Sequence, residues 1–163
     1  LIQKNVNESL EKEIEELRAY KAQHEKEKNS QSDIADWNEE FCVHFVSYIN
    51  PHKKYKFAYK WLEWFKMIAL ALDDCINYDE DASLIIDKVV ADREKINDKI
   101  VIHDEDFTTI RYQFIGHEVI SKESKKVASV FNTNHYHTIE KWALTPKGEK
   151  LLAQMMYIKT KKQ

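Results

Sequence analysis

Glycine and proline are scarce in this chain of 163 residues, which contains two of each. This composition excludes collagen-like, Gly-rich and Pro-rich classes of protein. With Gly116 and Gly148 as the only glycines, the sequence contains neither a Gly-rich phosphate loop nor a GxSxG nucleophile motif. Few sharp turns are expected, so the composition predicts long helices and long strands.

Cysteines and long apolar runs are also few. Cys42 and Cys75 form no CxxC pair and no metal-ligand spacing, so we expect no disulfide framework and infer a reducing compartment. The longest apolar run, residues 67–72, is far shorter than the roughly 20 residues of a membrane helix. With no visible signal peptide, we expect an intracellular protein, cytoplasmic or organellar. Because the sequence opens with Leu1 and not Met, we leave open whether its natural N-terminus lies upstream.

Charge is divided unevenly along the chain. Residues 1–106 carry 15 Lys and Arg against 24 Asp and Glu, whereas residues 107–163 carry 10 against 4. A basic C-terminal half can contact phosphates, so nucleic acid is one partner class to consider. A solvated basic surface explains the same distribution without a partner.

The N-terminal segment has the pattern of a solvated helix. Leu10, Ile14 and Leu17 follow the d, a, d spacing of a coiled coil over about two heptads, where about three or four are usual. We therefore divide the chain into a charged helical extension, residues 1–31, and a domain over residues 33–163. The three apolar residues are the candidate partner-binding residues, for a protein partner or a second copy.

The domain is predicted to begin with helices. Asp36 and Glu39 form a capping-box pattern before an apolar face spanning residues 37–49. A second helix is expected over residues 55–76, and a third starting at Asp79 or Asp81.

β-Branched and aromatic composition then predicts strands over residues 99–103, 107–116 and 126–144. The acidic residues 104–106 and the polar residues 121–126 are expected to be turns. Residues 151–158 fit either a last strand or a helix capped by Thr145 with Pro146 in its first turn. The expected fold class is α+β, with N-terminal helices followed by a curved antiparallel sheet of about four strands.

Three stretches carry a family resemblance: "VVADREKINDKIVIHDEDFTTIRYQF", "HYHTIEKWAL" and "TPKGEKLLAQMMYI". Their order resembles the cone-shaped fold of the nuclear-transport-factor-two-like superfamily, which includes the SnoaL-like cyclases. The resemblance covers about residues 80–160 and rests on pattern, without an invariant motif. It implies a pocket between the helices and the concave face of a sheet.

A rival resemblance is to winged-helix regulators. The stretch "WALTPKGEKLL" looks like the last wing strand and following helix of that fold, and "KKVASVFNTNHYHTIEKW" is similar to a helix-turn-helix. This alternative requires residues 125–140 to be helical, and it implies binding to DNA.

Candidate site residues follow from the cone resemblance, whose enzymes place proton-transfer groups in the pocket. If the protein is an enzyme, the candidate acid–base residues are His103, Arg111, His117, His135 and His137. The candidate ligand-pocket residues are Trp61, Trp64, Phe65 and Trp142. His135 and His137 share one face of a strand, as two metal ligands do, but no third ligand has a supporting spacing, so we expect no metal and no cofactor.

The sequence contains no catalytic signature. Our leading hypothesis is therefore a non-catalytic binding or assembly domain of a larger complex, with a protein partner or a homo-oligomer. The alternatives are a cofactor-independent isomerase, cyclase or dehydratase and a winged-helix DNA-binding regulator.

Overall fold

The computed structural model describes residues 2–32, 35–74, 79–129 and 134–161. The chain divides into two units, residues 1–35 and residues 36–163. No helix in these ranges is long and apolar enough to cross a membrane.

The first unit is a single helix, α1 (Ile2–Ser32), as the sequence predicts. The helix continues without interruption through the polar residues 26–32. Its sequence contains neither Gly nor Pro, the two residues that most strongly oppose helix formation.

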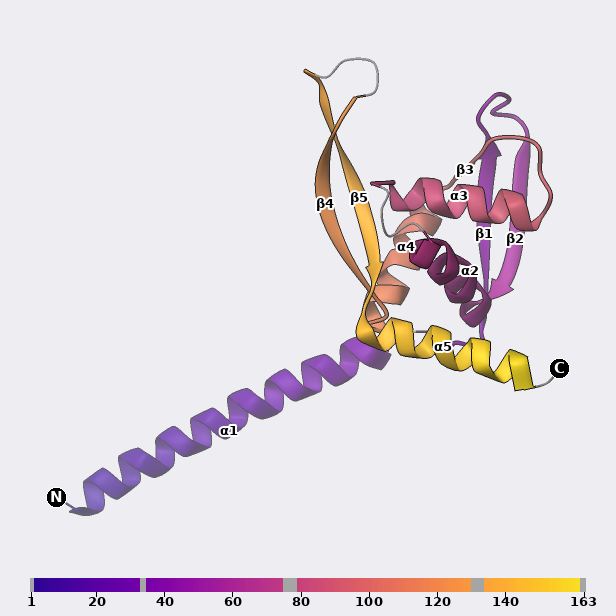
Figure 1. The fold of residues 1–163 in the computed structure, drawn as a ribbon. Coiled ribbons are helices and arrows are strands. Elements are labelled where there is room, and N and C mark those ends of the chain that lie inside the picture. The colour runs from indigo at the N-terminus through magenta and orange to yellow at the C-terminus, as the bar shows by residue number, and fades with distance from the viewer. Residues whose placement is uncertain (1, 33–34, 75–78, 130–133, 162–163) are drawn as a thin grey trace. The chain divides into compact units, whose positions relative to one another are not determined.

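The second unit opens with a three-stranded antiparallel sheet (Figure 1). It comprises β1 (Glu40–Ser47), β2 (Lys54–Lys60) and the short β3 (Ile100–Ile102), in the order β2-β1-β3. Strand β2 lies at an edge, and its burial alternates residue by residue, with lysines among the exposed positions. Strand β3 confirms the β-branched strand predicted at residues 99–103.

The helix predicted over residues 37–49 is wrong, because β1 occupies most of that segment. Phe41, Val43 and Phe45 alternate inward with a period of two, although Phe41 and Phe45 also satisfy the i, i+4 spacing of a helix. Asp36 does not cap a helix. Its Oδ1 atom accepts the Asn38 backbone N–H over 2.9 Å, forming a local turn.

Two helices follow the first hairpin. Helix α2 (Trp61–Asp74) begins six residues later than predicted, because residues 54–60 belong to β2. Helix α3 (Ala82–Arg93) begins where expected, with Asp81 as its N-cap residue. The Asp81 Oδ1 atom accepts the Ser83 backbone N–H over 3.0 Å. Ile85, Ile86 and Val90 of α3 are buried.

The strand predicted over residues 107–116 is wrong: this segment belongs to α4 (Asp104–Gly116). The expected turn at residues 104–106 is instead the first turn of this helix, where acidic side chains favour the positive end of the helix dipole. Burial of Ile110 and Phe114, one helical turn apart, outweighs the β-propensity of the neighbouring threonines and aromatics.

The chain continues as a hairpin of β4 (Ile120–Ala128) and β5 (Tyr136–Leu144), paired in register from Ile120↔Leu144 to Ala128↔Tyr136. The turn expected at residues 121–126 is wrong, since those residues lie inside β4. The rival winged-helix resemblance is also wrong, because it requires residues 125–140 to be helical and both of these strands run through that segment. Figure 1 shows the far end of this hairpin extending away from the helices.

The last element is helix α5 (Pro146–Lys161), so the helical alternative for residues 151–158 holds and the strand alternative does not. The Thr145 Oγ1 atom accepts the Gly148 backbone N–H over 3.0 Å and donates to the Glu118 carbonyl oxygen over 2.5 Å. The first of these bonds caps α5, and the second attaches it to the start of β4.

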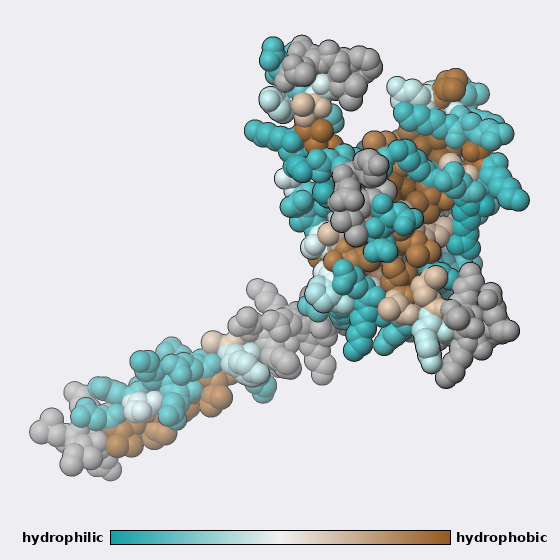
Figure 2. Space-filling model, in the orientation of Figure 1, coloured by the Kyte–Doolittle hydropathy of each residue, from teal (hydrophilic) through white to brown (hydrophobic). Residues whose placement is uncertain are grey.

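The described residues thus form an α+β fold with five helices and two antiparallel sheets, of three and two strands. This confirms the predicted fold class, although the single sheet of about four strands is replaced by two separate sheets. The core is rich in aromatic side chains, and the exposed surface in Figure 2 is largely hydrophilic over the strands and helix α3.

Candidate functional site

Helix α1 exposes a continuous apolar stripe. The exposed fractions are 51% for Val6, 50% for Leu10, 48% for Ile14 and 68% for Leu17. At about 3.6 residues per turn, these side chains lie within an arc of roughly 80°. Figure 2 shows hydrophobic side chains along one side of the helix and hydrophilic ones along the other. Leu10, Ile14 and Leu17 are the predicted partner-binding residues, and Val6 extends their stripe by one turn.

Every side chain described between residues 5 and 22 of α1 is exposed. A stripe of this length on a helix is unusual for a surface that meets only water, because a soluble helix normally turns its apolar face toward a core. It is therefore a candidate interaction surface.

All four predicted ligand-pocket residues are buried, and Trp142 of β5 is the one that lines a cavity described here. Trp61, Trp64 and Phe65 of α2 are buried. Trp61 stacks on Phe41 with ring centroids 4.4 Å apart, and the Trp64 Nε1–H donates to the Phe41 carbonyl oxygen over 3.0 Å. These contacts fasten α2 to β1, and none of the three residues lines either of the two cavities described here.

The predicted acid–base residues are spread over the second unit. His103 is the exposed N-cap residue of α4, and His117 is its C-cap residue, so a helix of about 20 Å separates them. His117 stacks on Trp37 at 4.1 Å and lies 3.1 Å from Gln113 Nε2. His135 and His137 are exposed near the far end of the hairpin. Of the five, Arg111 alone lines one of these two cavities.

Arg111 belongs to a polar cluster that joins α3, α4 and β5. Its Nε atom lies 3.1 Å from Glu140 Oε2, an ion pair whose angle falls outside hydrogen-bond geometry. The same carboxylate oxygen accepts the Trp142 Nε1–H over 2.8 Å. The Glu140 backbone N–H donates to Asp81 Oδ2 over 3.2 Å. Phe107 completes the cluster, with its ring stacked on Trp142 at 5.3 Å and the Arg111 guanidinium 5.0 Å from its centroid.

A cavity of about 370 Å³ adjoins this cluster. Its polar lining residues are Asp81, Ser83, Asp104, Thr108, Arg111 and Glu140. Asp81 and Glu140 already form hydrogen bonds or ion pairs within the protein. These contacts stabilise the fold and occupy the two carboxylates.

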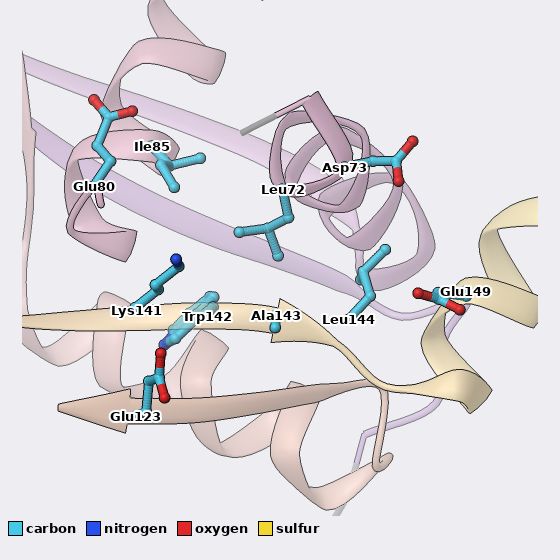
Figure 3. Close-up of a pocket in the computed structure, with 10 residues that line it drawn as sticks. All are labelled: Leu72, Asp73, Glu80, Ile85, Glu123, Lys141, Trp142, Ala143, Leu144 and Glu149. Carbon is cyan, nitrogen blue, oxygen red and sulfur yellow. The ribbon is translucent and has the colours of Figure 1, made fainter. Parts of the chain in front are cut away.

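A second cavity, of about 380 Å³, lies between α2, α3 and β5 (Figure 3). Figure 3 shows Leu72 and Leu144 pointing toward each other inside it. Its charged lining residues are Asp73, Glu80, Glu123, Lys141 and Glu149. Lys141 reaches out of this set to Asp79, 3.2 Å away, and Lys125 lies 2.7 Å from the same carboxylate. These hydrogen bonds, the one from Lys125 above all, lower the pKa of Asp79.

Two further features were missed by sequence reasoning. His44 Nδ1 lies 3.0 Å from Asp106 Oδ2, and the same oxygen accepts the His44 backbone N–H over 2.7 Å. Asp87 is 7% exposed and accepts the Ile102 backbone N–H over 2.8 Å. Burial raises the pKa of Asp87 to about 7. No sequence signal pointed to either, because each contact joins residues far apart in the chain. Among the residues described, no group of three or more His, Cys, Asp or Glu side chains is placed to hold a metal ion.

No family model matches the chain, and no curated protein or solved structure matches it. A function for this protein therefore has to be argued from the contacts and surfaces given above.

Proposed function

We propose that this protein is a binding module that assembles with a protein partner through the apolar stripe of α1, Val6 to Leu17. The observation that carries the proposal is the stripe itself: four large apolar side chains, each about half exposed or more, aligned on one face of a helix.

Covering the apolar stripe would stabilise α1. Most helical stability in proteins comes from packing an apolar face against another element. Burying a Leu, Ile or Val side chain contributes about 1.5–3 kcal/mol relative to leaving it exposed, before the cost of ordering it. A partner that covers the stripe therefore supplies the packing that stabilises α1.

The arrangement of polar residues in the second unit supports binding over catalysis. The isomerase hypothesis needs an enclosed pocket with at least two of the five predicted acid–base residues. Arg111 is the one that lines a cavity described here, and its ion pair with Glu140 already engages it.

The test uses the full chain, tagged and isolated from cells that express it naturally, with its complexes measured by native mass. The variant Leu10→Ser/Ile14→Ser/Leu17→Ser should lose the associated protein. The matched control Glu8→Ser/Lys12→Ser/Glu15→Ser changes three residues on the opposite face of α1 and should keep it. A wild-type chain isolated as a lone monomer would contradict the proposal.

A second candidate function is nucleic-acid binding by the β4–β5 hairpin. Its strands expose Lys122, Lys125 and Lys126, and a two-stranded ribbon fits the major groove of DNA. Lys122 and Lys126 lie on one face of the hairpin, four register positions apart. Binding of a fluorescent duplex should weaken with salt, and Lys122→Gln/Lys126→Gln should weaken it further. The control Lys56→Gln/Lys60→Gln removes equal charge from β2, and an equal effect of both pairs would argue against a specific site.

A further inference from the structure

We propose that the partner on the α1 stripe is a second copy of this chain, aligned in parallel as a two-stranded coiled coil. This inference rests on the assembly function proposed above and adds the identity and orientation of the partner.

Three of the four stripe residues, Leu10, Ile14 and Leu17, occupy the seam positions of a heptad repeat, and Val6 lies at the flanking position g. With Ile14 at position a, the a positions are Asn7, Ile14 and Lys21, and the d positions include Leu10 and Leu17. A β-branched residue at a with leucine at d favours two parallel strands over three or four. The stripe therefore has the side-chain shapes of a parallel dimer seam.

Asn7 favours the parallel alignment. In a parallel pair, each a residue meets its own copy, so the two Asn7 amides can hydrogen-bond to each other within the seam. In an antiparallel pair, a residues face d residues, so the registers that keep Ile14 opposite a leucine place Asn7 opposite Leu17 or His24. A single Asn at position a fixes register and strand number at some cost in stability.

The flanking charges are also complementary. In a parallel dimer, a g residue approaches the e residue five positions later in the other chain. Glu13 is at g and Arg18 is at e, so the parallel dimer places Glu13 of each copy near Arg18 of the other. Within one helix, residues five apart do not face each other, so Glu13 and Arg18 do not pair with each other in the isolated helix.

The seam is short, and its strength is correspondingly limited. Leu10, Ile14 and Leu17 supply three apolar layers, and Lys21 at the next a position ends them. A coiled coil usually needs about three or four heptads, so a reversible dimer is expected whose population depends on protein concentration.

The first experiment measures the mass of the purified full chain by light scattering from micromolar to millimolar concentration. The wild-type chain and Glu8→Ser/Lys12→Ser/Glu15→Ser should approach twice the monomer mass at the upper end. The variant Leu10→Ser/Ile14→Ser/Leu17→Ser should remain a monomer throughout. Dimers that persist in the stripe variant would place the interface elsewhere and overturn the inference.

The second experiment tests orientation by a charge exchange. Glu13→Arg should weaken the dimer about three- to tenfold, since two copies of the ion pair become repulsive. The double variant Glu13→Arg/Arg18→Glu should recover most of that loss if the two residues meet in parallel. A double variant no stronger than the single one would overturn the parallel alignment.

The third experiment is cross-linking in a Cys42→Ser/Cys75→Ser background, with folding checked by circular dichroism. Asn7→Cys should form a disulfide dimer readily, because position 7 meets its own copy. Lys12→Cys, on the opposite face, should form little. Equal cross-linking of both would mean random collision and would contradict the proposal.

The outcomes separate this inference from the proposed function. The purified chain could stay monomeric at all concentrations while the stripe variant loses a different protein from the cellular complex. That result would overturn self-association and leave the assembly function in place. A purified chain that stays monomeric and has no stripe-dependent complex in cells would overturn both self-association and the assembly function.

Discussion

Gly148 lies so close to Val119 that a β-carbon at position 148 would stand 2.1 Å from the Val119 carbonyl oxygen. The same carbonyl oxygen accepts the Thr145 backbone N–H over 3.1 Å. The first turn of α5 therefore packs directly against the backbone at the start of β4, with no room for a side chain.

Gly148→Ala should accordingly destabilise the protein by about 2 kcal/mol or more, because the obstructing atom is backbone and cannot turn aside. Chemical denaturation followed by tryptophan fluorescence measures the change. Ala153→Gly, at an exposed position of the same helix, is the control for helix propensity and should cost about 1 kcal/mol or less. A smaller loss for Gly148→Ala than for the control would show that the contact is less tight than described.

Thr145 is predicted to stabilise the same junction through its hydroxyl group. Thr145→Ala removes the cap on the Gly148 N–H and the bond to the Glu118 carbonyl, so a loss of about 1–2 kcal/mol is expected. Thr145→Ser retains the hydroxyl and should recover most of that stability. Equal losses in both variants would assign the effect to the methyl group instead.

Asp87 should make the stability of the protein depend on pH. Its pKa is about 7 in the fold, because of burial, against an ordinary value of 3.8. The folded state therefore holds a proton that the unfolded state has released, and stability falls as pH rises from about 4 through about 7. The slope from this one group is at most about 1.4 kcal/mol per pH unit.

Asp87→Asn keeps an oxygen for the Ile102 N–H and removes this titration. The variant should be more stable than the wild type at pH 8, with the difference shrinking toward pH 4, in urea titrations across that range. Asp79→Asn is the matched control, since the lysines that engage Asp79 lower its pKa and its contribution is lost only in acid. If the free energy of unfolding of Asp87→Asn depended on pH as that of the wild type does, the prediction would be contradicted.

Glu140 is predicted to hold the Arg111 cluster together. Glu140→Ala leaves the half-buried guanidinium and the Trp142 N–H without this partner, at a cost of about 1–3 kcal/mol. In a double-mutant cycle with Arg111→Met, the two losses should be less than additive by about 0.5 kcal/mol or more. Strict additivity would mean that the ion pair contributes nothing by itself.

Local signals explain which elements were predicted from the sequence. Asp79 and Asp81 were the two predicted starts of the third helix, because a short carboxylate side chain satisfies backbone N–H groups where a helix begins, and the structure selects Asp81. Residues 100–102 were recognised as a strand because three β-branched residues in succession pack well on a pleated surface. Thr145 and Pro146 carried the helical alternative for the last segment, and the structure selects it.

The errors arise where two periodicities fit the same residues. Phe41 and Phe45 are compatible with a helix face, but burial of Val43 between them requires an extended chain. Residues 107–116 have the composition of a strand, and tertiary packing of Ile110 and Phe114 makes them a helix. With that segment helical and residues 146–161 helical too, the cone resemblance loses two of its expected strands.

The polar contacts could not be predicted from the sequence, because they join residues that are far apart in the chain. His44 and Asp106 are 62 residues apart, and neither has a neighbouring residue that indicates the other. By contrast, three of the four residues of the α1 stripe, Leu10, Ile14 and Leu17, were found from spacing alone, because they lie on one helix and the 3.6-residue period places them together.

The edge strand β2 carries exposed lysines that oppose pairing with a strand of another molecule. Lys54, Lys56 and Lys60 are exposed on one face of this strand, which has a free hydrogen-bonding side. A strand from another molecule that tried to add there would bring like charges into register and strip water from each ammonium group. The lysines thus oppose fibre-like growth at this sheet edge, while the apolar stripe of α1 lies on a helix, whose backbone hydrogen bonds are satisfied internally.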